Sequence, residues 1–275
     1  MSSLTLPAAP VVTPAPTTRE EILAGRPRPA WGGLNRTLLG LEVRRLLRNR
    51  RSLFVTIALP TLMYLMITQG LDASEKVGRG TVGGLLMVSM GLWGAGACTA
   101  TVGAAVGLER AVGWSRQLRL TPLSPVAYVV AKTLAGMAGG LAGVLAVTGC
   151  GIARHDGTPL QVILPAMLVV WLGAAVFAAF GLFVGYLMPT DNAMQLVSLG
   201  MTAFCFLGGL FTPMSDDSFW GHVARFTPMW GLRRLAMSPF GDGQFTWLAV
   251  ANVAAWFVIF VGGAAWLMAR DTDRV

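Results

Sequence analysis

Six long apolar runs constrain this chain more than any other feature of its sequence. Each run approaches or exceeds the roughly 20 residues that an α-helix needs to cross the hydrocarbon core of a bilayer. Because lipid offers no hydrogen-bond partners, only helices and closed barrels can span it. The sequence therefore predicts an all-α, polytopic membrane protein with six transmembrane helices. The runs lie at about residues 53–70, 82–108, 126–152, 160–188, 193–212 and 245–269.

The amount and the placement of charge agree with this class. Only 12% of the residues are charged, against about a quarter in a typical soluble domain, and 54% are hydrophobic. The net charge is +8, but the basic residues lie at the ends of the apolar runs and not on a soluble basic domain. We therefore expect membrane lipids as partners, and no nucleic acid.

Lys and Arg are more frequent in the segments that share a side with the N-terminus. This bias, together with an even number of spans, predicts that both termini are cytoplasmic. Residues 1–30 are rich in Pro and are expected to be a disordered tail. Residues 31–51 are expected to form a basic helix on the membrane surface, and a simple basic stop before the first span is the alternative. Residues 52–275 would form the six-span domain.

One charged segment, Glu109–Lys132, lies between two long uncharged runs. The predicted orientation places it in the cytoplasm. We expect a helix from Glu109 to Leu120 that ends at Thr121-Pro122, because the residue before a proline avoids the α region. A loop that only sets topology needs positive charge alone. A helix that also carries Trp114 indicates a surface that another protein contacts, with a generic positive-inside loop as the alternative.

The segment between the fifth and sixth spans, residues 213–243, is too long for a turn and is rich in Trp and Phe. Ser215 or Asp216 is expected to cap a helix that runs to Arg225. Thr227-Pro228 is expected to start a second helix, which ends at Met237. Aromatic residues mixed with Arg suit the headgroup region. We therefore predict a short helical pair that dips into the outer leaflet, and an ordinary interfacial loop is the alternative.

The sequence offers no set of catalytic or metal-binding residues. Its three cysteines lie inside apolar runs, and no CxxC motif is present. Lys132-Thr133 resembles the end of a phosphate-binding loop, but the glycines that such a loop requires are missing. No Asp, Glu, Lys or Arg lies near the middle of a span, where ion-coupled carriers usually need one. We therefore expect no catalytic residues, no metal site and no cofactor, and ATP-driven work would need another subunit.

The stretch LERAVGWSRQLRLTPLSPVAYVVAK, residues 108–132, resembles the cytoplasmic loop of the ABC type-2 exporter permeases, especially the daunorubicin-resistance-like branch. The resemblance extends from Leu34 over most of the chain. Members of this family act as pairs of six-span subunits bound to two separate ATP-binding subunits. The resemblance thus implies an ABC ATP-binding subunit and a second permease subunit as partners, in a homodimer or a heterodimer, with ATP and Mg²⁺ on the ATP-binding subunit.

By the same resemblance, the helix from Glu109 to Leu120 is a coupling helix that docks on the ATPase. The family often has a second acidic residue shortly after the first, whereas Ala111 and Val112 follow Arg110 here. The acidic contact with the ATPase would then depend on Glu109 alone. The residues expected to couple to the ATPase are Glu109, Arg110, Gly113, Trp114, Arg116, Leu118, Arg119, Thr121 and Pro122.

The resemblance implies ATP-driven export across the bacterial plasma membrane. The apolar lining expected for the cavity favours an amphiphilic drug-like or lipid-like substrate, as in multidrug efflux and antibiotic resistance, and the sequence does not separate drug efflux from lipid export or polysaccharide export. The substrate cavity would be lined by the first, second and fifth spans. Its candidate residues are Tyr64, Met87, Met201, Phe204 and Phe206, for each of which ordinary helix packing is the competing interpretation. An ion-coupled secondary carrier and a non-transporting membrane partner of a sensor system are the alternative functions.

Overall fold

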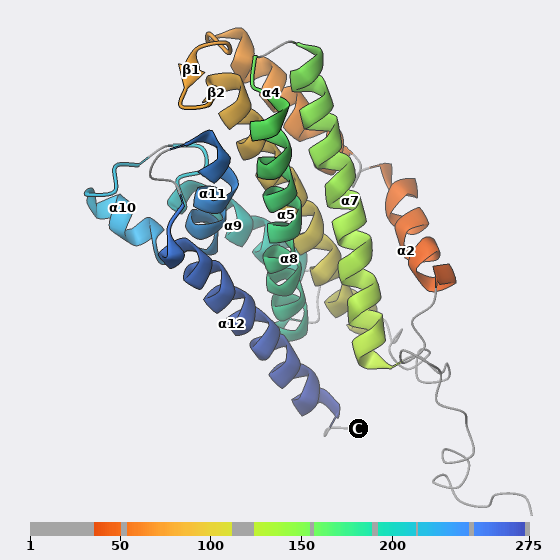
Figure 1. Cartoon of the computed structure of the whole chain (residues 1–275). Coiled ribbons are helices and arrows are strands. Elements are labelled where there is room, and N and C mark those ends of the chain that lie inside the picture. The colour runs from red at the N-terminus through yellow and green to blue at the C-terminus, as the bar shows by residue number, and fades with distance from the viewer. Residues whose placement is uncertain are drawn as a thin grey trace, which may run out of the picture.

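The computed structural model describes residues 36–50, 54–111, 124–154, 157–188, 192–212, 214–241 and 245–272, and the structural statements below refer to these residues. They form a bundle of helices with one short antiparallel hairpin, β1 (Lys76–Val77) and β2 (Gly80–Thr81) (Figure 1). The all-α prediction is thereby confirmed. The expected tail at residues 1–30 lies outside the described residues.

Six apolar helices lie where the apolar runs predicted them, and four are long enough to cross a membrane. These four are α5 (Val82–Ala111), α7 (Pro125–Ala153), α8 (Leu160–Leu187) and α12 (Trp247–Thr272). The first and fifth runs form shorter helices, so a count of six crossing helices stays a prediction. The shorter elements are α4 (Leu59–Gln69), which follows the π-helical turn η2 (Phe54–Ala58), and α9 (Asn192–Leu207).

Local sequence explains why these two helices are short. Pro60 lacks an amide hydrogen for the regular i to i−4 bond, and a π-helical turn directly precedes it. At the end of α9, Gly209 adopts a left-handed conformation with φ of 72°. The amide of Leu210 then donates to the carbonyl of Cys205 at 2.9 Å, which is the bond of a glycine-terminated helix. The fifth helix therefore stops before the end of its apolar run.

The centre of the bundle is the close crossing of α5 and α8, which is built on glycine. A Cβ atom added to Gly103 would lie 2.5 Å from the carbonyl oxygen of Ala178, and one added to Gly107 or Gly181 would also collide with backbone of the other helix. Small residues let two helices approach until their backbones touch. Gly103 and Gly107 on α5, and Gly181 and Gly185 on α8, are thus pairs at four-residue spacing that join two helices of the same chain.

The basic helix α2 (Arg36–Arg48) lies alongside α7 (Figure 1). The two helices run in the same direction, because Glu42 binds Lys132 and, one turn further along α2, Leu46 lies against Gly139. The predicted helix is present and packs lengthwise on α7, because its polar and apolar residues both find partners there. Its position at the membrane surface stays a prediction.

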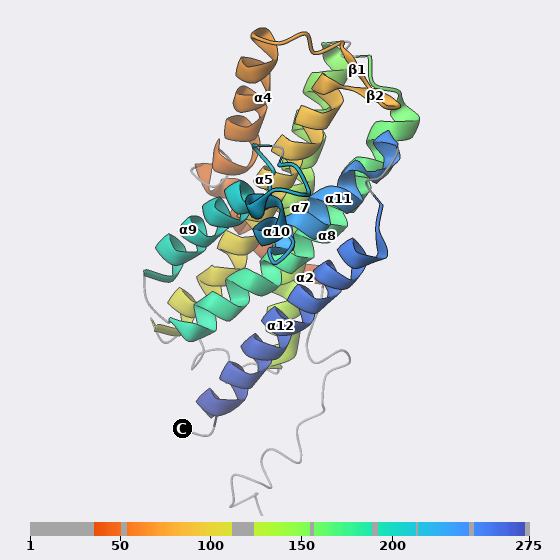
Figure 2. The same cartoon turned by 90° about the vertical axis from the view of Figure 1, so that its left-hand side faces the viewer.

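The helical pair before the last span is present as predicted, in α10 (Phe219–Ala224) and α11 (Pro228–Met237) (Figure 2). Thr227 caps α11 through the amide of Trp230, as expected. The cap of α10 is Ser218, which accepts a hydrogen bond from Gly221 at 2.9 Å, and the expectation of Ser215 or Asp216 was wrong. The Leu232 side chain meets Gly173 near the middle of α8, so the pair reaches deep between the long helices.

The two ends of the bundle differ in character. At one end α5 finishes and α7 begins, and α8 and α12 also finish there (Figures 1 and 2). We call this the charged end, because Glu42, Arg45, Glu109 and Lys132 meet there. The opposite end carries the β1–β2 hairpin. There the amide of Arg79 donates to the carbonyl of Phe240 at 2.6 Å, which ties the α4–α5 connection to the turn η3 (Ser238–Phe240) after α11.

Candidate functional site

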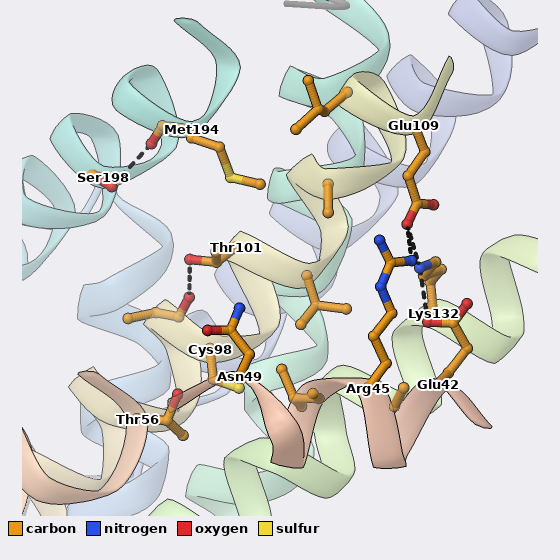
Figure 3. Close-up of a pocket in the computed structure, with 16 residues that line it drawn as sticks. Glu42, Arg45, Asn49, Thr56, Cys98, Thr101, Glu109, Lys132, Met194 and Ser198 are labelled. Carbon is orange, nitrogen blue, oxygen red and sulfur yellow. Dashed lines mark hydrogen bonds and ion pairs between the residues drawn. The ribbon is translucent and has the colours of Figure 1, made fainter. Parts of the chain in front are cut away.

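A cavity of about 550 Å³ lies beside the charged end (Figure 3). Its walls come from α2, η2, α5, α7 and α9. One part of the lining carries charge, and the rest consists of small, aliphatic and hydroxyl side chains. The uncharged part includes Thr56, Thr101, Val102, Met194 and Ser198. The cavity therefore offers both polar and apolar contacts to a single molecule.

The charged part of the lining is a four-charge cluster made of Glu42, Arg45, Glu109 and Lys132. The Lys132 ammonium donates to the Glu42 carboxylate at 2.7 Å and to the Glu109 carboxylate at 2.8 Å. The Arg45 guanidinium donates to the same Glu109 oxygen at 2.6 Å. Figure 3 shows the four side chains pointing toward one another. Two acids face two bases, so the cluster has no formal net charge.

The members of this cluster differ widely in burial. The side chain of Lys132 is 4% exposed, and those of Glu109 and Glu42 are 10% and 15% exposed, whereas Arg45 is 65% exposed. The Tyr128 hydroxyl donates a further short hydrogen bond to the second Glu109 oxygen. A buried ion pair is costly to desolvate, but removing one partner costs more, because a buried charge is then left uncompensated. Lys132 is therefore the centre on which the two glutamates depend.

Local structure places each of these side chains. Glu109 lies in the last turn of α5, just before the charged segment continues. Ser124 caps α7 by accepting from the amide of Ala127 at 3.1 Å. Tyr128 and Lys132 follow four residues apart, so both project from one face of α7. Glu42 and Arg45 are three residues apart on α2 and share a face for the same reason.

Only the start of the predicted coupling helix lies within the described residues. Glu109 and Arg110 belong to α5, and the Glu109 carboxylate is bound by three side chains of this chain. Its expected contact with an ATPase stays a prediction, and the structure shows what else this carboxylate does. The other expected coupling residues lie outside the described part of the chain: Gly113, Trp114, Arg116, Leu118, Arg119, Thr121 and Pro122.

The five expected substrate residues do not line this cavity. Tyr64, Met87 and Met201 are buried in the main hydrophobic core. Phe204 packs on Phe180 with ring centroids 5.2 Å apart, and Phe206 is 51% exposed. The first, second and fifth spans were expected to line the substrate cavity, and elements of all three line this one. Helices α2 and α7 also line it, which was not expected.

Lys132 is a functional candidate that was not predicted from the sequence. It was named as the end of the charged segment and as part of an incomplete phosphate-binding loop, and no site role was expected for it. A usable signal was present, because a lysine two turns inside an apolar helix needs an acidic partner. Glu109 and Glu42 are the acids that meet this need, and Glu42 lies 90 residues away in the sequence. In the described ranges, no group of three or more His, Cys, Asp or Glu side chains has a metal-binding arrangement.

Comparison with known proteins gives two findings. The family model described as ABC-2 type transporter matches residues 34–240. The chain is also similar to a Bacillus subtilis (strain 168) protein named "Putative transport permease YvfS", with 20% identity over 223 residues. That match covers 80% of this chain and 91% of the Bacillus protein.

Proposed function

Because the chain belongs to the ABC-2 type transporter family, we propose that it is the permease subunit of a bacterial ATP-driven exporter. It would move an amphiphilic drug-like or lipid-like molecule outward across the plasma membrane. ATP would be hydrolysed by a separate ABC ATP-binding subunit, and a second permease subunit would complete the membrane part. The name of the Bacillus relative, a transport permease, agrees with this proposal.

The cavity beside the charged end is the observation that carries the proposal. Glu109 and Lys132 line it. Glu109 begins the helix Glu109–Leu120 that the resemblance assigns to coupling, and Lys132 follows that helix in the sequence. A force on that helix would therefore act directly at the wall of the cavity. The charged end would face the cytoplasm, as the Lys and Arg bias predicts.

The lining of the cavity supports an amphiphilic substrate. A charged head would meet Arg45 and the paired glutamates, while an apolar part would lie along Val102 and Met194. Ligand sites typically combine a mostly apolar wall with a few polar groups that fix orientation. A sugar or a small ion would leave the aliphatic wall unused.

A secondary carrier is less well supported by the arrangement of charge. Carriers bind their driving ion near the middle of the bilayer, where broken helices or ionisable side chains provide ligands. Here Lys132 and Glu109 lie at the charged end and neutralise each other. We therefore retain the ATP-driven exporter as the proposal.

The test is purification of the tagged chain from native membranes with its partners, followed by reconstitution into liposomes. We expect a nucleotide-hydrolysing subunit to copurify. We also expect ATP to drive transport of ethidium or of an NBD-labelled phosphatidylethanolamine. Transport by the isolated chain under an ion gradient, without nucleotide, would contradict the proposal. A chain that carries Lys132→Met serves to show that transport requires the intact charged end.

A further inference from the structure

The four-charge cluster joins three parts of the chain at one point. Glu109 is in the last turn of α5, Lys132 is in the first turns of α7, and Glu42 and Arg45 are on α2. The end of α5 and the first turns of α7 are therefore bonded to each other, through Glu109 and Lys132. Both places are also bonded to α2, which precedes them in the sequence by more than sixty residues.

The two bonds that hold α2 in the cluster are not equivalent. The Glu42–Lys132 pair is shielded from water, because the two side chains are only 15% and 4% exposed. The Arg45 side chain, which binds Glu109 of α5, is 65% exposed, and water screens an ion pair whose donor is exposed. The shielded Glu42–Lys132 pair is thus the stronger of the two polar bonds that hold α2 in the cluster.

Packing extends this connection toward the cavity wall. Beyond the ion pair, Leu46 lies against Gly139, and the carbonyl of Thr56 in η2 lies against Gly143. Each contact lies further along both segments than the one before it. The helix α2 and the turn η2 therefore follow α7 from the charged end to the middle of that helix, and both line the cavity.

We propose that Glu42 and Lys132 are positioning residues that make α2 and η2 move together with α7 as one rigid unit. When the start of α7 is displaced, the Glu42–Lys132 pair transmits this displacement to the α2–η2 wall of the cavity. This inference rests on the proposed function, because it describes how the same cavity is coupled to the motor. It assigns no contact with substrate to either residue.

A purely structural role for the pair predicts something different. If the cluster only stabilised the fold, its loss would lower ATP hydrolysis and transport together, through the amount of folded protein. A transmitting role predicts that hydrolysis persists while transport is lost. It also predicts that a covalent link between α2 and α7 can replace the ion pair.

The test uses the complex with its ATPase in proteoliposomes, and it compares ATP hydrolysis with ATP-driven ethidium transport. Glu42→Gln removes the negative charge from the bond between α2 and Lys132 and leaves the Lys132–Glu109 pair in place. We expect transport per ATP hydrolysed to fall about tenfold, which is the size of effect that losing one charge-assisted hydrogen bond produces. The matched control is Arg44→Gln on the same helix, since the Arg44 side chain is exposed and lies outside the cluster. This control should keep the ratio of the unmodified protein.

The covalent replacement is Leu46→Cys with Gly139→Cys in a Cys98→Ala background. A side chain at Gly139 would meet only the Leu46 side chain and the Cys98 sulfur at close range, and these substitutions shorten both. Oxidation should form the cross-link and restore most of the coupling that Glu42→Gln loses, and reduction should abolish it again. The Cys98→Ala protein with Glu42 intact serves as the reference.

The outcomes separate this inference from the proposed function. If the unmodified complex shows no ATP-driven transport, the proposed function fails. If it transports and Glu42→Gln transports equally well, or if the formed cross-link restores nothing, the rigid-unit inference is overturned. The cross-link in a chain that retains Glu42 gives a check that needs no destabilising variant. Transport should continue when α2 is locked to α7, and a block would show that the two helices must separate.

Discussion

The clearest energetic prediction concerns Lys132→Met. Methionine has a similar length and shape but lacks the ammonium group that binds two carboxylates. Lys132 is 4% exposed, and its partners Glu42 and Glu109 are 15% and 10% exposed. The substitution therefore leaves the cluster with two acids and one base in a poorly hydrated place. Breaking a buried ion pair from one side costs about 3–5 kcal/mol.

The expected shift in melting temperature follows from this cost. For a chain of roughly this length, 1 kcal/mol corresponds to about 2–4 °C, so Lys132→Met should lower the Tm by roughly 6–20 °C. Arg45→Gln removes a bond whose donor is mostly exposed, and it should cost about 1 kcal/mol or less. Arg44→Gln, a change of an exposed residue on the same helix, should have almost no effect.

The assay is thermal unfolding of the purified protein in lipid nanodiscs, followed by intrinsic tryptophan fluorescence. The double variant Lys132→Met with Glu42→Gln should recover part of the lost stability, because Glu42 is the acid left without a base, whereas Glu109 keeps its bond to Arg45. The account of the cluster is refuted if Lys132→Met melts within about 2 °C of the unmodified protein, the shift that 1 kcal/mol or less would give. It is also refuted if the Arg45 and Lys132 variants are equally destabilised.

Three further predictions follow from other parts of the structure. Gly181→Leu should reduce the yield of folded protein in the membrane, because any side chain there collides with the backbone of α5, whereas Gly149→Leu should be tolerated because nothing lies within 4 Å of it. Thr227→Ala removes the cap of α11 and should cost about 1 kcal/mol in thermal unfolding, while Ser215→Ala should cost less because Ser215 does not cap α10 through its side chain. Trp114→Cys should react with a membrane-impermeant maleimide only when the cytoplasmic face is accessible, and labelling of intact cells would reverse the predicted orientation.

Much of the fold could be predicted from the sequence because its determinants are local. Run length and composition located six apolar helices, and Thr227-Pro228 marked the start of α11 correctly. The predicted length failed where a local feature interrupts an apolar run. Hydropathy does not register the left-handed Gly209, which ends the fifth helix before its apolar run ends, or the π-helical turn before Pro60 in the first helix.

The candidate site was predicted only in part. The charged segment that begins at Glu109 was recognised, and the spans expected to form a cavity do contribute to its wall. The residues chosen as substrate contacts were selected by type, as uncharged side chains, many of them aromatic, on the first, second and fifth spans. Such side chains also fill cores, and Tyr64 and Met87 are buried there. Sequence alone does not tell which face of a uniformly apolar helix points inward.

The sequence by itself determined that the chain is a helical membrane protein, and it located the charged stretch between two apolar helices. These properties depend on the transfer of neighbouring residues into lipid, which their composition fixes. Only the tertiary structure decided that Glu109 and Lys132 bind each other and that α2 joins them through Glu42, 90 residues from its partner. Ion pairing depends on distance in space, and α2, α5 and α7 come within that distance only after small residues have allowed the long helices to pack.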